Sequence, residues 1–243
     1  MNLHQDWHVH SSEFSLDAYS TIAENIRAAG ERGITTLGLA DHARSDSTWI
    51  PVRNKMIALQ MVRDDIEIFL GIEVKILRLD GALDIPQDIS GIDFILIADH
   101  QYPSVVGPLE PTVVRDIIQS GHLTGRDALD CVLQALINSV LKAPQTSRGS
   151  ILAHPFSLLP KLGLSEAMIS ASQLEALGSA LLVRDAALEV NEKWRCPSDS
   201  VILALKNLGV RIVAGSDSHK SDDVGVYSRI LCSDLELVSS DEI

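Results

Sequence analysis

Residues 94–100 read Phe-Ile-Leu-Ile-Ala-Asp-His, five apolar residues followed by a carboxylate and an imidazole. The shortness of the run favours a strand, and its continuous apolarity favours a strand buried on both faces. Strands of this kind belong to parallel sheets that helices cover. The carboxyl ends of parallel strands converge on one face, so the Asp-His end predicts where functional groups gather.

Six other runs share this form, and helical segments separate them. The seven runs cover residues 6–10, 36–42, 68–74, 94–100, 150–154, 188–191 and 211–217. The clearest helix is 21–29, which begins with the capping box Thr21-x-x-Glu24 and is expected to stop at Gly30 and Gly33. Two others are predicted over 124–141, ended by Pro144, and over 198–208, closed by Gly209.

Alternating strands and helices predict a parallel α/β fold, and seven units suit a closed or nearly closed barrel. An open doubly wound sheet is the competing architecture, although no GxGxxG motif follows the first strand. The length of 243 residues fits one domain over residues 1–243 better than two.

Composition narrows the class of function. The hydrophobic content of 46% with 4% aromatic residues describes an aliphatic interior, and the net charge of -13 disfavours long nucleic acids and anionic membranes as partners. No signal peptide or membrane-spanning run is evident, so a cytoplasmic location is expected. Cys131, Cys196 and Cys232 form no CxxC pair, which predicts reduced thiols and no thiolate zinc site.

Imidazoles and carboxylates are concentrated at the ends of the predicted strands. Six of the eight histidines lie there, and the ends read His8-Val9-His10, Asp41-His42, Glu73, Asp99-His100, His154, Asn191 and Asp217-Ser218-His219. His8 and His10 alternate around Val9, so both rings project to one side of a strand. Together these side chains supply six imidazoles and at least two carboxylates without a thiolate, which favours catalytic Zn, Mn or Fe.

Each of these motifs also has a structural interpretation when taken alone. An isolated His-x-His pair is about as often two satisfied histidines as a metal site. Glu73 could form a salt bridge with Lys75 or lie at an exposed strand end, and His100 or His154 could be a core histidine. Gly215 is expected to permit a tight turn before Asp217, and such a turn could be simple loop chemistry.

In their order and spacing, these motifs resemble the PHP (polymerase and histidinol phosphatase) superfamily over nearly the whole chain. The matching elements are His8-x-His10, Asp41-His42, Gly71-Ile72-Glu73, His100, His154-Pro155 and Gly215-Ser216-Asp217-Ser218-His219. Glu189-Val190-Asn191 with Arg195, and Asp223-Val224-Gly225, resemble the histidinol-phosphatase branch. The resemblance implies a distorted (β/α)7 barrel and a centre of two or three divalent metals.

By position, the resemblance implies three ligand sets. One metal takes His8, His10, Glu73 and Asp217; a second shares Glu73 and adds His100 and His154; a third uses His42, His219 and Asp17. Asp17 could instead be only a carboxylate at a helix entry, which would leave two ions.

The implied reaction is attack on a phosphate by a hydroxide that two metals share. Arg195 is the leading phosphate contact, with Arg44, Lys75 and Lys193 as further candidates. Asp217, His219 or a metal-bound water could protonate the leaving group.

Three functions are compatible with this reading. The first is hydrolysis of a small phosphomonoester such as histidinol phosphate. The second is a phosphodiesterase or exonuclease acting on nucleotides or short oligonucleotides, and the third is a metal-binding domain without turnover. Residues 101–148 lie between two proposed ligands and are expected to shape substrate choice.

Overall fold

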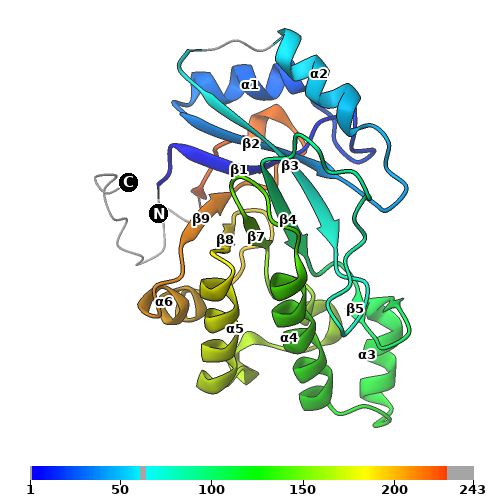
Figure 1. Ribbon diagram of the computed structural model, residues 1–243. Helices are drawn as coiled ribbons and strands as arrows, with labels where there is room; N and C mark the ends of the chain where they lie inside the picture. Colours follow the sequence, from blue (N-terminus) through cyan, green and yellow to red (C-terminus); the bar gives the residue numbers. More distant parts are fainter. Residues whose placement is uncertain (1, 61–63, 229–243) are drawn as a thin grey trace.

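The computed structural model describes residues 2–60 and 64–228, and the chain is built around seven parallel strands (Figure 1). The strands are β1 (Gln5–Val9), β2 (Thr36–His42), β3 (Glu67–Lys75), β4 (Phe94–Ala98), β7 (Ser150–Ala153), β8 (Ala187–Asn191) and β9 (Ile212–Gly215). They pair in this order, and every pairing is parallel. The seven strands predicted from the sequence are therefore confirmed.

The two outer strands meet and nearly close the sheet. Val9 bridges Ser218 in parallel, with hydrogen bonds from His10 N to Ser218 O (2.9 Å) and from Ser218 N to His8 O (3.1 Å). The fold is thus the predicted (β/α)7 barrel, and the alternative of an open doubly wound sheet is wrong.

Helices surround the barrel on its outside (Figure 1). They are α1 (Ile22–Glu31), α2 (Ile50–Gln60), α3 (Pro111–Gln119), α4 (Gly125–Lys142), α5 (Ala171–Val183) and α6 (Asp199–Asn207). Short 3-10 helices cover Leu159–Leu162, Glu166–Met168 and Ser221–Asp223, and a small antiparallel hairpin joins β5 (Tyr102–Pro103) to β6 (Pro108–Leu109). None of the helices in the described ranges is long and apolar enough to cross a membrane.

The helix boundaries largely follow the capping signals. Thr21 forms the predicted capping box with Glu24, but α1 continues through Gly30 to Glu31, and the chain turns only at Gly33, which has φ +70°. Gly30 is tolerated inside the helix because its cost there is only about 1 kcal/mol. Thr124 caps α4 through Asp127 N, and Ser198 precedes α6 as expected.

Aromatic residues fill the amino-terminal part of the barrel interior. The ring of Trp7 stacks on Phe69 at 5.2 Å and meets the edge of Phe94 at 5.3 Å. Gly38 and Gly71 leave space for Phe94, because a Cβ atom at either position would overlap its ring. With this end packed, the clustered histidines lie toward the carboxyl ends of the strands.

Two expectations about the whole chain have different outcomes. Cys131 is a free thiol, as predicted, Cys196 is buried, and Cys232 lies outside the described residues. The single domain over residues 1–243 stays a prediction, since residues 1, 61–63 and 229–243 also lie outside them.

Candidate metal centre

Glu73, near the end of β3, lies at the middle of a cluster of imidazoles. Its Oε1 atom is 2.9 Å from His154 Nε2, 3.1 Å from His100 Nε2 and 3.7 Å from His8 Nε2. Its Oε2 atom is 2.7 Å from His42 Nδ1 and 3.6 Å from His10 Nε2. The two oxygens thus face different groups of rings, which is the arrangement of a carboxylate able to bridge two ions.

Three overlapping groups have ligand atoms within 4.8 Å of one another: His8, His10 and Asp217; His8, Glu73 and His154; and His10, His42 and His219. The strands and the turns after them supply all of these residues. The first two groups are buried, whereas His42 and His219 are partly exposed at the mouth of the barrel. The cluster therefore runs from the barrel interior to its surface.

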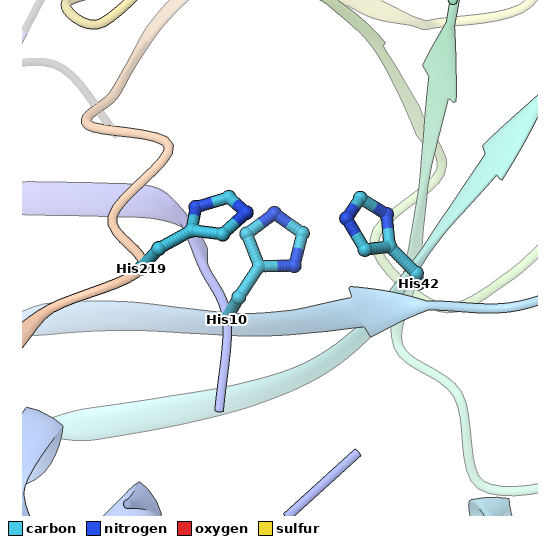
Figure 2. A group of neighbouring side chains, drawn as sticks. All are labelled: His10, His42 and His219. Carbon is cyan, nitrogen blue, oxygen red and sulfur yellow. The ribbon is translucent and has the colours of Figure 1, made fainter. Parts of the chain in front are cut away.

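Figure 2 shows the outermost group, in which the rings of His10, His42 and His219 come from three separate segments. The His10 ring centroid lies 4.4 Å from both of the others. Asp17 Oδ2 lies 3.1 Å from His219 Nε2 and 3.4 Å from His42 Nε2. Asp17 thus lies beside His42 and His219, as predicted for the ligands of a third metal. The ring of His10, which was assigned to the first metal, lies close to both of these histidines.

Two of the clustered residues have unusual backbone angles. His154 and Asp217 follow β7 and β9 with φ values of +30° and +54°. Positive φ is strained for residues other than glycine, and such strain is concentrated at functional sites. Gly215 does not have a positive φ, so the turn predicted there is made by Asp217 itself.

Gly215 has a different role, which is to leave space. A Cβ atom at this position would overlap Oε1 of Glu189 and lie 2.9 Å from His8 Cβ. Glycine therefore allows the Glu189 carboxylate to lie between β8 and His8.

The buried carboxylate of Glu189 orients two of the candidate ligands. Oε1 accepts a hydrogen bond from His8 Nδ1 (2.8 Å), and Oε2 accepts from the backbone N–H of His154 (2.5 Å). A proton on His8 Nδ1 leaves Nε2 as the ring atom available to an ion. The sequence motifs did not indicate that Glu189 orients these histidines.

His154 and His10 have comparable partners on their outer side. The Nδ1 atom of His154 is 3.3 Å from Ser157 Oγ, which donates to Asp99 Oδ1 at 3.0 Å. The Nδ1 atom of His10 is 3.3 Å from Ser15 Oγ, which donates to Asp41 Oδ1 at 2.9 Å. Asp41 and Asp99 therefore lie behind the ligands and not among them.

Buried charge shifts the pKa values in the cluster in opposite directions. Burial disfavours the charged form of His8, but Glu189, Asp217 and Glu73 raise its pKa well above the usual value. Burial lowers the pKa of His10 well below its usual value, although Glu73 opposes this. Burial also disfavours ionised Glu73, yet His100, His8 and His42 hold its pKa well below the usual range. The carboxylates thus attract positive charge into the centre.

The donor atoms fit divalent metals. Glu73 Oε2 is buried and accepts no hydrogen bond, despite its short distance to His42. The Nε2 atoms of His8 and His10 lie 3.0 Å apart while both Nδ1 atoms face outer oxygens. Two bare nitrogens at this distance repel unless a proton or a metal ion lies between them. Imidazoles and carboxylates without thiolates suit Zn, Mn or Fe.

The four cations that the sequence suggested for phosphate binding differ in position. Lys193 Nζ lies 3.1 Å from both Asp217 Oδ1 and His219 Nδ1, directly beside the cluster. Lys75 lies further out, 3.4 Å from Gln101 and 3.9 Å from Asp84. Arg44 and Arg195 are exposed, and neither is among the side chains that contact the cluster within residues 2–60 and 64–228.

Lys161 and Trp194 are two further residues at the mouth that the sequence did not single out. The ammonium of Lys161 lies 4.2 Å from the centroid of the Trp194 ring, and this ring is 6.1 Å from that of His154. Lys161 comes from the short 3-10 helix after β7 and Trp194 from the loop after β8, so only the fold brings them together.

Fold and site together define a metal-binding α/β barrel whose candidate ligands come from successive strand ends. The model of the PHP domain family matches residues 6–229. The chain belongs to the PHP domain family, as the resemblance of its motifs predicted.

Curated relatives extend over most of the chain. A "Probable phosphatase" from Thermoanaerobacter sp. (strain X514) is 26% identical over 238 residues, covering 95% of this chain and 85% of the relative. Another from Shewanella oneidensis is 26% identical over 230 residues, covering 93% and 80%. Together with the family, these relatives confirm the predicted enzyme class, a phosphoesterase.

Two solved structures share the fold. One is assigned as histidinol phosphatase HisK from Listeria monocytogenes, with a TM-score of 0.72 at 16% identity, covering 94% of this chain and 100% of that one. The other is the histidinol phosphate phosphatase HisK of Lactococcus lactis in complex with zinc, L-histidinol and phosphate, with a TM-score of 0.59 at 19% identity, covering 89% and 86%. At these identities the likeness establishes the fold alone.

Proposed function

We propose that the chain hydrolyses a small phosphomonoester with the help of two or three divalent metals. The observation that carries this proposal is the position of Glu73, a buried carboxylate with imidazoles facing both of its oxygens. A purely structural glutamate needs one or two partners, and a core of satisfied histidines would not leave Glu73 Oε2 without a hydrogen bond.

The proposed ligands keep the sets that the resemblance implied, with one addition. His8, His10, Glu73 and Asp217 hold one ion, and Glu73, His100 and His154 hold a second. His42, His219 and Asp17 hold a third, with His10 able to contribute because its ring lies between the two others. Zn, Mn and Fe all suit these donors; when bound, such ions supply an activated water and polarise the phosphate.

The residues at the mouth bind the phosphate and handle the proton of the leaving group. Lys193 lies directly beside the cluster and contacts a phosphate oxygen, supported by Lys161 across the Trp194 ring. Arg195, Lys75 and Arg44 contribute at longer range. Asp217 and His219 are the groups able to deliver a proton to the leaving oxygen, because His219 Nδ1 lies 3.3 Å from Asp217 Oδ1 at the partly exposed edge of the cluster.

Histidinol phosphate is the leading substrate within this class. The HisK protein of Lactococcus lactis, which shares the fold, is described with L-histidinol and phosphate bound. A pocket of about 430 Å³ opens beside Asp217 and His219 and is also lined by Lys193 and Lys220. This volume suits a small metabolite and is too small for a long oligonucleotide.

The test is a panel of substrates with metal-loaded protein. It contains histidinol phosphate, other phosphorylated metabolites, p-nitrophenyl phosphate and bis-p-nitrophenyl phosphate. We expect turnover of monoesters, with histidinol phosphate among the best, and little turnover of the diester. Preference for the diester would favour the phosphodiesterase alternative. If metal-loaded protein hydrolysed none of these compounds, the alternative of a metal-binding domain without turnover would be favoured.

A further inference from the structure

Trp194 makes one hydrogen bond to the metal cluster. Its indole Nε1–H donates to Asp217 Oδ2 over 2.8 Å. The residue itself is held in place, because its backbone N–H donates to Asn191 Oδ1 (2.9 Å) at the end of β8. The indole therefore approaches Asp217 from a fixed position.

This bond makes the two oxygens of Asp217 different. Oδ1 faces the cluster, 3.6 Å from His10 Nε2 and 3.3 Å from His219 Nδ1, and accepts a hydrogen bond from the exposed Lys193 Nζ (3.1 Å), whereas Oδ2 accepts from the indole. A carboxylate with both oxygens free can rotate and bind an ion through either atom or through both. A single donor fixed on one oxygen removes that freedom.

We propose that Trp194 is a positioning residue that restricts Asp217 to metal binding through Oδ1 alone. The inference rests on the metal site of the proposed function. It assigns the indole a role that the resemblance and the sequence motifs did not suggest.

Simple packing does not explain the contact. Trp194 is 39% exposed, so water could satisfy its N–H without help from the protein. Asp217 is only 4% exposed, and another donor to it, Lys193 Nζ, acts on the opposite oxygen, Oδ1. The hydrogen bond therefore matters more to the carboxylate than to the indole, as expected for a group that orients a ligand.

Trp194→Phe tests the proposal, because it keeps an aromatic ring for Lys161 and removes only the N–H donor. We expect about 10- to 100-fold weaker Zn²⁺ affinity in a competition titration with a chelator, with an unchanged far-UV circular dichroism spectrum. Trp7→Phe is the matched control, since it also loses one indole hydrogen bond, to Gln5 Oε1 (3.0 Å), but among the aromatic residues at the other end of the barrel.

The outcomes separate this inference from the proposed function. Equal Zn²⁺ affinity of Trp194→Phe and the wild type would overturn the positioning role while leaving the metal site intact. Absence of Zn²⁺ binding by the wild type would refute the metal site itself.

A second measurement does not depend on changing Trp194. The chain has three tryptophans, so the double variant Trp7→Phe/Trp49→Phe leaves Trp194 as the single tryptophan, whose emission can be excited selectively over that of tyrosine. Because the indole donates to a carboxylate that becomes a metal ligand, its emission should change during a Zn²⁺ titration, with the same midpoint as metal uptake. Constant emission while elemental analysis finds bound zinc would contradict the proposal.

Discussion

His8 and Glu189 are 181 positions apart in the sequence and are joined by a hydrogen bond of 2.8 Å between His8 Nδ1 and Glu189 Oε1. Both side chains are fully buried. The carboxylate fixes the protonated nitrogen of the ring, so that Nε2 points to Glu73 and His10. The geometry of the candidate centre thus depends on a residue that is not itself a candidate ligand.

Glu189→Gln should weaken metal binding without removing a ligand. The amide keeps the shape of the side chain but loses the negative charge that holds the proton on His8 Nδ1. We expect about 10- to 100-fold lower metal affinity, measured by competition with a chelator and by elemental analysis. Glu175→Gln, an exposed change on α5, is the control and should bind metal as the wild type does. Unchanged affinity of Glu189→Gln would show that the His8 ring is oriented by other contacts.

Gly215→Ala tests the same contact between His8 and Glu189 by removing the space that the Glu189 carboxylate occupies. The new methyl group would overlap the Glu189 carboxylate, so the carboxylate or the His8 ring has to move. Overpacking of this kind costs about 1–3 kcal/mol, which urea unfolding can measure, and the displaced Glu189 should also lower metal content. Gly125→Ala at the start of α4, where a Cβ meets the flexible side chains of Leu164 at 3.0 Å and Met168 at 3.7 Å, should change stability little. A fully stable Gly215→Ala protein that binds metal normally would contradict this account.

The strands were predictable because their apolar runs carry the information locally. Runs such as Phe94–Ala98 have no polar residue to place them at a surface, and the ligands at their ends follow from the rule for parallel sheets. The helices were less predictable. The α2 helix was missed because Ile50–Gln60 has no apolar stripe, and α3 and α5 were not predicted either. The α1 helix passes Gly30 because packing outweighs its small helix cost.

The contacts around the ligands could not be predicted, for a physical reason. Glu189 occurs inside a predicted strand, and only the register of β8 with β9 and the closure of β1 on β9 place it against His8. Trp194 and Lys161 likewise meet only because the segments after β7 and β8 are neighbours in the folded chain. Local patterns contain no information about such long-range neighbours.

The phosphate contact can be assigned by comparing Lys193→Met with Arg195→Met. Lys193 lies 3.1 Å from Asp217 Oδ1, whereas the exposed Arg195 side chain is not among the described residues that contact the cluster. Loss of a hydrogen bond to a charged group costs about 1.5–3 kcal/mol, so kcat/KM of Lys193→Met should fall roughly 10- to 150-fold. Arg195→Met should have a smaller effect. A larger loss for Arg195→Met would restore Arg195 as the principal phosphate contact, as the sequence suggested.

Metal binding should stabilise the fold, because the ions neutralise the carboxylates that the cluster buries. A ligand at about 100 times its Kd adds about 2.7 kcal/mol when it binds only the folded state. For a chain of this length each kcal/mol raises Tm by about 2–4 °C, so adding Zn²⁺ to chelator-treated protein should raise Tm by about 5–10 °C. Glu73→Gln provides the control, since it changes the carboxylate that faces both groups of imidazoles, and it should lose at least one ion, most of the activity and much of the shift. If Glu73→Gln and the wild type gained the same Tm and held the same number of ions, Glu73 would not be the shared ligand.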